Sequence, residues 1–193
     1  NVVLGKNAQG KTNLLEAIYF CAIGKSLRAV REKELIFWDE PMAKISLNVE
    51  KKFGKSRIDI TLNRVGKKIV AIDRLPIRKI GELMGELNAV FFSPDELKLV
   101  KESPEDRRRF MDISISQTSK EYFYLLGRYS KILANRNKLL KENLSANAIK
   151  DTISIWDEQL AQVGAKLIIY RIAFLKTILP YAKLSHGYLT EGD

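Results

Sequence analysis

Asn1-Val2-Val3-Leu4-Gly5-Lys6-Asn7-Ala8-Gln9-Gly10-Lys11-Thr12 decides the fold of this chain, because an apolar run enters a loop framed by two glycines and ended by Lys-Thr. A strand, such a loop and a helix are together typical of a phosphate-binding P-loop. Gly5 and Gly10 let the backbone turn with its N–H groups inward. Lys11 can reach the outer phosphates, and the Thr12 hydroxyl can ligate Mg²⁺. We therefore predict a nucleoside triphosphate site, with a plain glycine-rich turn as the alternative.

The residues after the loop predict a helix that ends at Ile23, because apolar side chains recur there at helical spacing. The phosphates would then also lie at a helix N-terminus, where backbone N–H groups favour anions. The residues expected to bind the nucleotide are Gly5, Lys6, Asn7, Ala8, Gln9, Gly10, Lys11, Thr12 and Asn13.

The composition indicates a globular, basic protein. The chain has 193 residues, of which 46% are hydrophobic, and 33 Lys and Arg outnumber 23 Asp and Glu to give a net charge of +10. This length allows one good hydrophobic core, or a domain with an appendage. The charge favours a polyanionic partner, such as nucleic acid or an anionic membrane surface, and leaves open a basic surface without a partner.

The single cysteine, Cys21, excludes an internal disulfide and favours the reducing cytoplasm. We interpret it as core packing behind the P-loop. No apolar run approaches the roughly 20 residues that span a bilayer, so we expect a soluble protein without a membrane partner. The chain has no initiator Met and opens inside an expected strand, so we expect a fragment of a longer protein.

Residues 43–72 alternate in hydropathy and predict three antiparallel strands, with Gly54 and Gly66 at the turns. The positions expected on the apolar face are Ile45, Leu47, Val49, Ile58, Ile60, Leu62, Ile69 and Ala71. Residues 78–86 predict a short helix with Ile80, Leu83 and Met84 inward. The apolar run 87–92 predicts a buried strand of a central sheet.

A helical region begins at Ser103, an expected N-cap that precedes Pro104 at the first helical position. Two apolar stripes follow at alternating steps of four and three, which is the spacing of a heptad seam. The first consists of Tyr122, Leu126, Tyr129, Leu133 and Leu140, with Arg136 in the remaining seam position; the second consists of Ile149, Ile153, Trp156, Leu160, Val163, Leu167, Tyr170 and Phe174. The polar linker 142–147 lets the stripes fold as an antiparallel hairpin, which Pro180 is expected to close.

These patterns predict an α/β fold with three parts. Residues 1–102 form a P-loop lobe with an antiparallel β meander, and residues 103–180 form a helical hairpin arm. Residues 181–193 are expected to begin a strand region that the chain does not finish.

Half of the net charge lies on the arm. From Lys120 to Lys150 there are seven cations and two anions, interleaved with tyrosines on the first helix. A nucleic-acid backbone and a solvated helix face explain this pattern about equally well. The candidate DNA contacts are Lys131, Arg136 and Lys138. Arg107, Arg108 and Arg109 could contact DNA phosphate, nucleotide phosphate or only acidic neighbours.

ATP hydrolysis needs a second acidic centre, usually an Asp at the end of a hydrophobic strand. Asp39 follows an apolar run that is short and close to the P-loop helix, so we interpret it as a surface turn. Asp73 most simply ends the third meander strand. The sole histidine, His186, has no Cys or carboxylate cluster at ligand spacing, which argues against zinc. The sequence therefore predicts nucleotide binding without an obvious catalytic residue.

At this point the residues resemble a known group. Residues 5–18, Gly-Lys-Asn-Ala-Gln-Gly-Lys-Thr-Asn-Leu-Leu-Glu-Ala-Ile, resemble the extended Walker A motif of the SMC, Rad50 and RecF group of ABC-type ATPases. Within that group, four stretches resemble the RecF family of DNA replication and repair proteins: residues 24–28, 34–36, 92–100 and 103–112. The resemblance runs from end to end of the chain.

The resemblance implies an ABC-type ATPase lobe followed by an arm of a second lobe. It also implies an ATP-dependent clamp on double-stranded DNA, at gaps or single-strand/duplex junctions, in recombinational repair, the SOS response and fork maintenance. Such a protein dimerises on ATP with Mg²⁺, works with RecR and RecO, hydrolyses ATP weakly, and lies in the cytoplasm at the nucleoid. Walker B and signature motifs of the group would lie beyond Asp193, so this chain is expected to be nearly inactive as an ATPase.

Two further residues are compared with this group. Arg28 matches an arginine that faces DNA or nucleotide in related proteins, whereas Gln117 lies within an expected helix and receives no role. Two other functions stay open. A small-molecule P-loop kinase would need an arginine-bearing lid, and the head of another SMC or Rad50-like protein would carry a far longer coiled coil than the hairpin here.

Overall fold

A computed structural model describes residues 1–26, 29, 31–93, 99, 103–141 and 146–190, with side chains of the last range from Thr152 onward. The chain divides into two compact units, Asn1–Lys101 and Glu102–Asp193. None of the described helices is long and apolar enough to cross a membrane.

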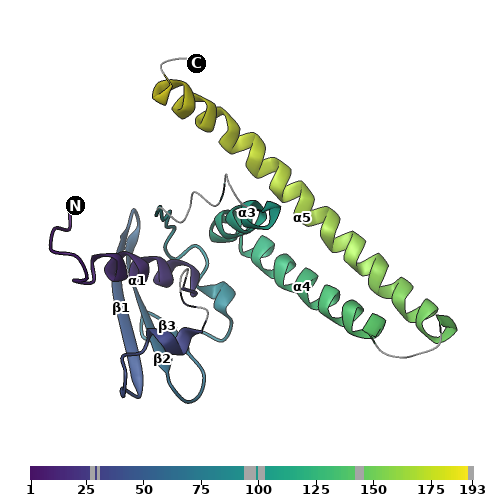
Figure 1. Ribbon diagram of the computed structural model, residues 1–193, viewed down its shortest axis with the longest axis horizontal. Coiled ribbons are helices and arrows are strands. Elements are labelled where there is room, and N and C mark those ends of the chain that lie inside the picture. Colours follow the sequence, from purple (N-terminus) through teal and green to yellow (C-terminus); the bar gives the residue numbers. More distant parts are fainter. Residues whose placement is uncertain (27–28, 30, 94–98, 100–102, 142–145, 191–193) are drawn as a thin grey trace. The chain divides into compact units, whose positions relative to one another are not determined.

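In its described elements, the first unit combines helix α1 with an antiparallel sheet (Figure 1). Helix α1 (Lys11–Ile23) lies across β1 and β2, and the strands follow the order β1-β2-β3-β4. The strands are β1 (Met42–Lys51), β2 (Gly54–Asn63), β3 (Ile69–Ile72) and β4 (Leu75–Pro76); two 3₁₀ turns are η1 (Glu32–Leu35) and η2 (Ile80–Glu82). The predicted three-strand meander is thus confirmed, and β4 adds a short fourth strand.

The core of this unit lies between α1 and the inner face of β2. Alternate residues of β2 are buried, because successive side chains of a strand point to opposite faces. The buried apolar side chains are Tyr19, Phe20, Cys21, Ala22, Ile36, Ile58, Ile60, Leu62, Val70, Leu83 and Met84. The prediction for β3 was wrong by one residue: Val70, paired with Ile60, is buried, whereas Ile69 is exposed.

Two other strand predictions for this unit were wrong. Residues 1–4 and 87–92 form no strand, and Val2, Leu4, Val90 and Phe92 are each more than three-quarters exposed. A strand is stable only when neighbouring strands accept its backbone hydrogen bonds, and every strand of the described sheet lies between residues 42 and 76. The predicted helix 78–86 is also shorter than expected, because only η2 and the turn after it form, although Leu83 and Met84 are buried as predicted.

Cys21 is buried behind the P-loop helix, as predicted. Burial raises the pKa of its thiol to about 11, and the charge of Asp59 contributes to the rise. Because the thiolate is the reactive form, we expect native Cys21 to react with Ellman's reagent at pH 8 about 100-fold more slowly than an unburied thiol. The same reaction in denaturant should release one thiol per chain at the ordinary rate. Equal rates in both conditions would contradict the described core.

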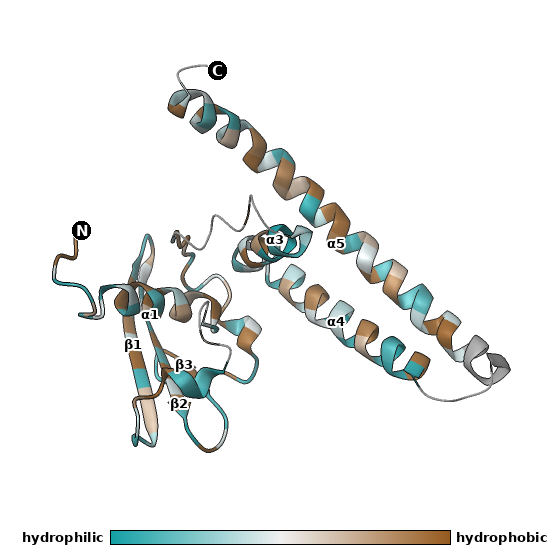
Figure 2. Cartoon of the chain, viewed as in Figure 1, coloured by the Kyte–Doolittle hydropathy of each residue, from teal (hydrophilic) through white to brown (hydrophobic). Residues whose placement is uncertain are grey.

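As far as the structure describes it, the second unit contains the helices α3 (Pro104–Thr118), α4 (Lys120–Lys141) and α5 (Ala146–Leu189). Helices α4 and α5 pack side by side, as predicted for the hairpin (Figure 1). Ser103 caps α3 as predicted, because its hydroxyl accepts the backbone N–H of Glu105. Hydrophobic and hydrophilic residues recur along both long helices (Figure 2).

The seam between α4 and α5 follows the predicted spacing with two exceptions. Tyr122, Val163 and Leu167 are buried as predicted, but Leu140 is half exposed, and Ile132, which was not predicted, is buried in place of its neighbour Leu133. The linker residues 142–145 lie outside the described part, and the side chain of Ile149 does as well.

The predicted end of the second helix was wrong. Pro180 lies inside α5, which continues to Leu189, so the strand region expected from residue 181 is helical as far as the structure describes it. A proline within a helix removes a backbone hydrogen bond and crowds the carbonyl four residues earlier, but it does not always end the helix. The spacing of Tyr181, Leu184 and Tyr188 is helical rather than alternating, which favours continuation of α5.

Candidate functional site

The expected nucleotide site is a loop that opens directly into the N-terminus of α1. Gly10 occupies the N-cap of α1 in the left-handed conformation, with φ of 82° and ψ of 10°. No side chain caps the helix there, so the first backbone N–H groups are available to an anion. This is the backbone geometry that a phosphate requires.

Two features of the loop itself fit a phosphate group. Ala8 has a φ of +62°, which is uncommon for a residue with a Cβ and is typical of strained functional loops. The ammonium of Lys11 donates to the carbonyl oxygens of Gly5 at 2.7 Å and Lys6 at 2.6 Å. Lys11 thus holds its charge at the loop, where an incoming phosphate could replace either carbonyl. Thr12 is exposed on the first turn of α1.

The opposite end of α1 is fixed to the rest of the unit. Gly24 ends the helix in the left-handed conformation, and its N–H donates to Phe20 O at 2.7 Å. The ammonium of Lys68 donates to Gly24 O at 2.7 Å, pairs with Glu32, and lies 5.3 Å from the centroid of the Phe20 ring. Lys68 therefore links α1, η1 and the start of β3. Sequence reasoning missed this residue, because its partners are 36 to 48 positions away.

A second contact fixes the chain after α1. Glu16 is buried and accepts the hydroxyl of Ser26, whose oxygen also accepts the N–H of Ala29 at 2.9 Å. Glu16 belongs to the extended Walker A pattern, and its observed partner is thus a residue of the segment that follows α1. Arg28 lies outside the described residues, as do most of residues 92–100.

The two aspartates considered for hydrolysis have other positions in the described structure. Asp39 is exposed on a turn with a φ of +65°, as expected for a surface turn. Asp73 follows β3 and accepts the N–H of Arg57 at 2.7 Å, so it stabilises the end of the sheet. Across the part of the chain that the structure describes, no three His, Cys, Asp or Glu side chains gather as a metal site would require.

The candidate DNA contacts on α4 separate into two groups. Lys131 and Lys138 are exposed and lie seven residues apart, so they share one face of the helix. Arg136 lies in the seam, as its spacing predicted, and its guanidinium forms an ion pair with Asp157 of α5. The charge of Arg136 is therefore already paired within the arm.

Two further cations extend the exposed face of α4. Arg128 precedes Lys131 by three residues and Lys141 follows Lys138 by three, which is the spacing of neighbours on a helix. All four are exposed, and none has a hydrogen bond or ion pair with the described residues. We call Arg128, Lys131, Lys138 and Lys141 the α4 stripe. Of the other candidates, Arg107 to Arg109 are exposed on α3 and Gln117 is buried near its end.

The chain was compared with family models, curated proteins and solved structures. No family model matches the chain. It is 50% identical over 191 residues to the DNA replication and repair protein RecF of Alkaliphilus oremlandii (strain OhILAs), a match that covers 99% of this chain and 52% of that protein. The RecF of Clostridium acetobutylicum is 44% identical over 192 residues, with coverage of 100% and 52%. The chain thus spans about half the length of the curated relatives it matches.

Two solved structures of RecF, each described as the recombination mediator protein in the RecFOR pathway, are also similar. The RecF-ATP structure has a TM-score of 0.85 and 36% identity, covering 92% of this chain and 48% of that one. The RecF-ATPrS structure has a TM-score of 0.82 and 36% identity, covering 90% and 47%. The expected fold class, an α/β P-loop lobe of ABC type with a β meander and a helical hairpin arm, is therefore confirmed.

Proposed function

Because the chain belongs to the RecF family over its whole length, we propose that it binds ATP with Mg²⁺ through residues 5–13 and acts in DNA replication and repair. The P-loop at the N-terminus of α1 is the observation that carries this proposal. Backbone N–H groups from Gly10 onward receive the phosphates, Lys11 neutralises their charge, and Thr12 supplies a hydroxyl to Mg²⁺. Solved RecF structures with ATP and ATPrS, at 36% identity, support this assignment.

We propose that ATP binding, rather than rapid ATP hydrolysis, controls the association of two chains. Neither candidate aspartate is positioned to orient an attacking water, since Asp39 belongs to a surface turn and Asp73 accepts the N–H of Arg57 in β2. We therefore propose that this chain hydrolyses ATP slowly. Its bound ATP would stabilise a homodimer, and RecR and RecO would be partners of the whole protein.

The partner that this proposal assigns to the α4 stripe is double-stranded DNA. These four cations, which have no ion pair with the described residues, can neutralise phosphates of a duplex without reading its sequence. Arg136 is left out of this surface because of its ion pair with Asp157. A duplex with a gap or a single-strand junction is the proposed substrate.

Fluorescence anisotropy of a labelled duplex tests this function. We expect Mg²⁺–ATP to increase the affinity of the chain for duplex DNA by about 5- to 150-fold, the usual range of coupling between two sites. Replacing both Lys131 and Lys138 by alanine should lower the slope of log affinity against log salt by about 2, because each phosphate contact contributes about 0.9. The nucleotide affinity should stay unchanged in this variant.

Matched substitutions on α5 provide the control. Lys166 and Lys176 are also exposed lysines of the arm, and their joint replacement by alanine removes the same charge from another helix. If this variant loses as much duplex affinity as the α4 variant, the effect comes from net charge, and the assignment to the α4 stripe is wrong. A duplex affinity that does not respond to ATP would contradict the switch.

A further inference from the structure

A short turn after η1 exposes two large aromatic side chains. Phe37 is 77% exposed and Trp38 is 82% exposed, although the preceding Ile36 is buried in the core. The turn is fixed by Arg64, which donates through Nε to Glu40 O and through a terminal nitrogen to Phe37 O, each at 2.8 Å. Neighbouring exposed aromatic side chains on a fixed backbone are typical of a binding surface.

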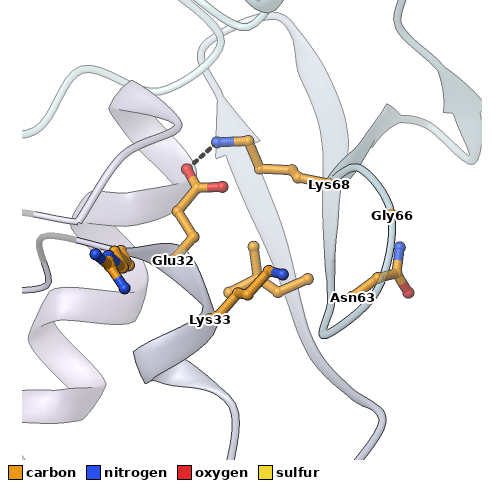
Figure 3. Close-up of a pocket in the computed structure, with 7 residues that line it drawn as sticks. Glu32, Lys33, Asn63, Gly66 and Lys68 are labelled. Carbon is orange, nitrogen blue, oxygen red and sulfur yellow. Dashed lines mark hydrogen bonds and ion pairs between the residues drawn. The ribbon is translucent and has the colours of Figure 1, made fainter.

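A pocket of about 390 Å³ lies between η1 and the turn that follows β2 (Figure 3). It is lined by Arg31, Glu32, Lys33, Leu62, Asn63, Gly66 and Lys68. Glu32 is neutralised by its ion pair with Lys68, and Asn63 closes the turn after β2 by donating to Lys67 O at 2.8 Å. The side-chain charges of Arg31 and Lys33 have no partner among the described residues. The pocket therefore has an excess of positive charge.

This pocket is separate from the proposed ATP site. Lys68 reaches the carbonyl of Gly24 at the C-terminal end of α1, whereas the P-loop precedes its N-terminal end. A helix of 13 residues is about 20 Å long, since each residue adds about 1.5 Å. One nucleotide cannot occupy both ends. An anion bound by Arg31 and Lys33 would therefore be a ligand other than that nucleotide.

The pocket and the aromatic turn are connected along the chain and through Arg64. Residues of η1 line the pocket and lead directly through Ile36 to Trp38, while Asn63 of the pocket is followed by Arg64, which holds the turn. The carboxylates near the turn, Asp39 and Glu40, disfavour phosphate beside the aromatic rings, but they do not oppose an uncharged base. The surface thus offers cations at one end and an aromatic face at the other.

We propose that Arg31, Lys33 and Trp38 form a binding site for single-stranded nucleic acid, which we call the sheet-end site. A phosphodiester group contacts Arg31 and Lys33 over the pocket, and a neighbouring base stacks on the Trp38 ring. A single strand fits this surface better than a duplex, because the faces of its bases are free to stack. The site does not depend on ATP or on the α4 stripe.

Binding of a labelled oligothymidine of about ten nucleotides tests the proposal, since single-strand modules cover about 4–16 nucleotides. We expect the oligonucleotide to quench the emission of Trp38, and Trp38→Ala to weaken its binding about tenfold or more. Replacing Arg31 and Lys33 together by alanine should lower the salt slope by about 1.4, because each phosphate of a single strand contributes about 0.7.

The opposite end of the β1–β2 hairpin offers a matched control. Phe53 is 87% exposed on a turn there, next to Lys52, whose ammonium lies 5.4 Å from the centroid of its ring. Phe53→Ala and Lys52→Ala should leave oligothymidine binding unchanged. Unaltered affinity in Trp38→Ala, equal losses in the control variants, or no binding at low salt would each overturn the sheet-end site.

The same measurements separate this inference from the proposed function. Loss of ATP-stimulated duplex binding with retained, Trp38-dependent oligothymidine binding would contradict the proposed function alone. Retained duplex binding without an effect of Trp38→Ala on oligothymidine would contradict the sheet-end site alone. Duplex that competes with oligothymidine as strongly as unlabelled oligothymidine does would overturn the preference for single strands.

Discussion

Replacing Lys11 by alanine is expected to weaken ATP binding by about 150-fold. The ammonium of Lys11 lies at the P-loop, and its two present acceptors, Gly5 O and Lys6 O, mark where phosphate oxygens can be reached. Two hydrogen bonds from a charged donor contribute about 1.5 kcal/mol each, or about 3 kcal/mol together. The dissociation constant of a fluorescent ATP analogue, measured with Mg²⁺, checks this result.

Lys25→Ala is the matched control for Lys11→Ala. Lys25 is exposed just after the other end of α1, so its replacement removes one charge from the same region without touching the loop. Its ATP affinity should equal that of the unmodified chain. Both variants should melt at the same temperature, because neither lysine is buried. Full ATP affinity in Lys11→Ala would show that the nucleotide site lies elsewhere.

The second large effect is expected in the arm, where Arg171 connects three helices. Its guanidinium donates to both carboxylate oxygens of Asp112 at 2.9 Å and, through Nε, to the hydroxyl of Tyr122 at 3.1 Å. Tyr122 is fully buried and itself donates to Asp112. Burial, followed by the Asp112 interaction, raises the pKa of the Tyr122 hydroxyl, which therefore stays neutral. This cluster joins α3, α4 and α5.

We expect Arg171→Ala to lower the free energy of unfolding of the arm by about 2–3 kcal/mol. Breaking a fully buried ion pair costs about 3–5 kcal/mol, and the lower value reflects the partial exposure of both side chains, 22% for Arg171 and 16% for Asp112. For a unit of this size the melting temperature should fall by about 10–20 °C. Helical circular dichroism measures this change, because the arm holds most of the helical residues.

The ion pair of Arg136 with Asp157 is the control for this prediction. It also joins two helices of the arm, but its side chains are 28% and 49% exposed. Exposed pairs contribute little, since water and salt screen them, so Arg136→Ala should have a much smaller effect. If Arg136→Ala destabilises the arm as much as Arg171→Ala does, packing rather than the Asp112 cluster explains the loss.

The sequence predicted best those features that depend on neighbouring residues. The cap at Ser103, the P-loop helix and the α4–α5 seam each follow from spacings of three or four residues. The two apolar runs at 1–4 and 87–92 were wrong as strands because their structure depends on partner strands that no local pattern reveals. The prediction of which β3 side chains face the core was wrong for a related reason. Every residue in the run 69–72 is apolar, so pairing with β2, not hydropathy, decides which side chains are buried.

In the candidate site, too, the features set by neighbouring residues could be predicted and those set by distant residues could not. Its backbone could be predicted, since glycine positions dictate where a P-loop turns. The contacts that hold the P-loop helix in place could not be predicted, because those of Lys68 and the Glu16–Ser26 pair depend on how α1 lies against the sheet. The pairing of Arg136 was foreseeable from its seam position, although Asp157 as its partner required the register between two helices.

The unequal ends of α1 have a mechanical consequence. Gly24 is fastened to β3 and η1 through Lys68, and its left-handed turn packs closely against Ile80. At the other end, Leu14, Leu15 and Ile18 are exposed, and Gly5 and Gly10 have open space around them. Buried contacts thus hold the C-terminal half of α1, whereas its exposed first turn carries the P-loop. A ligand that pulls on the P-loop therefore transmits that force along the helix to the buried residues 19–22 and to Lys68.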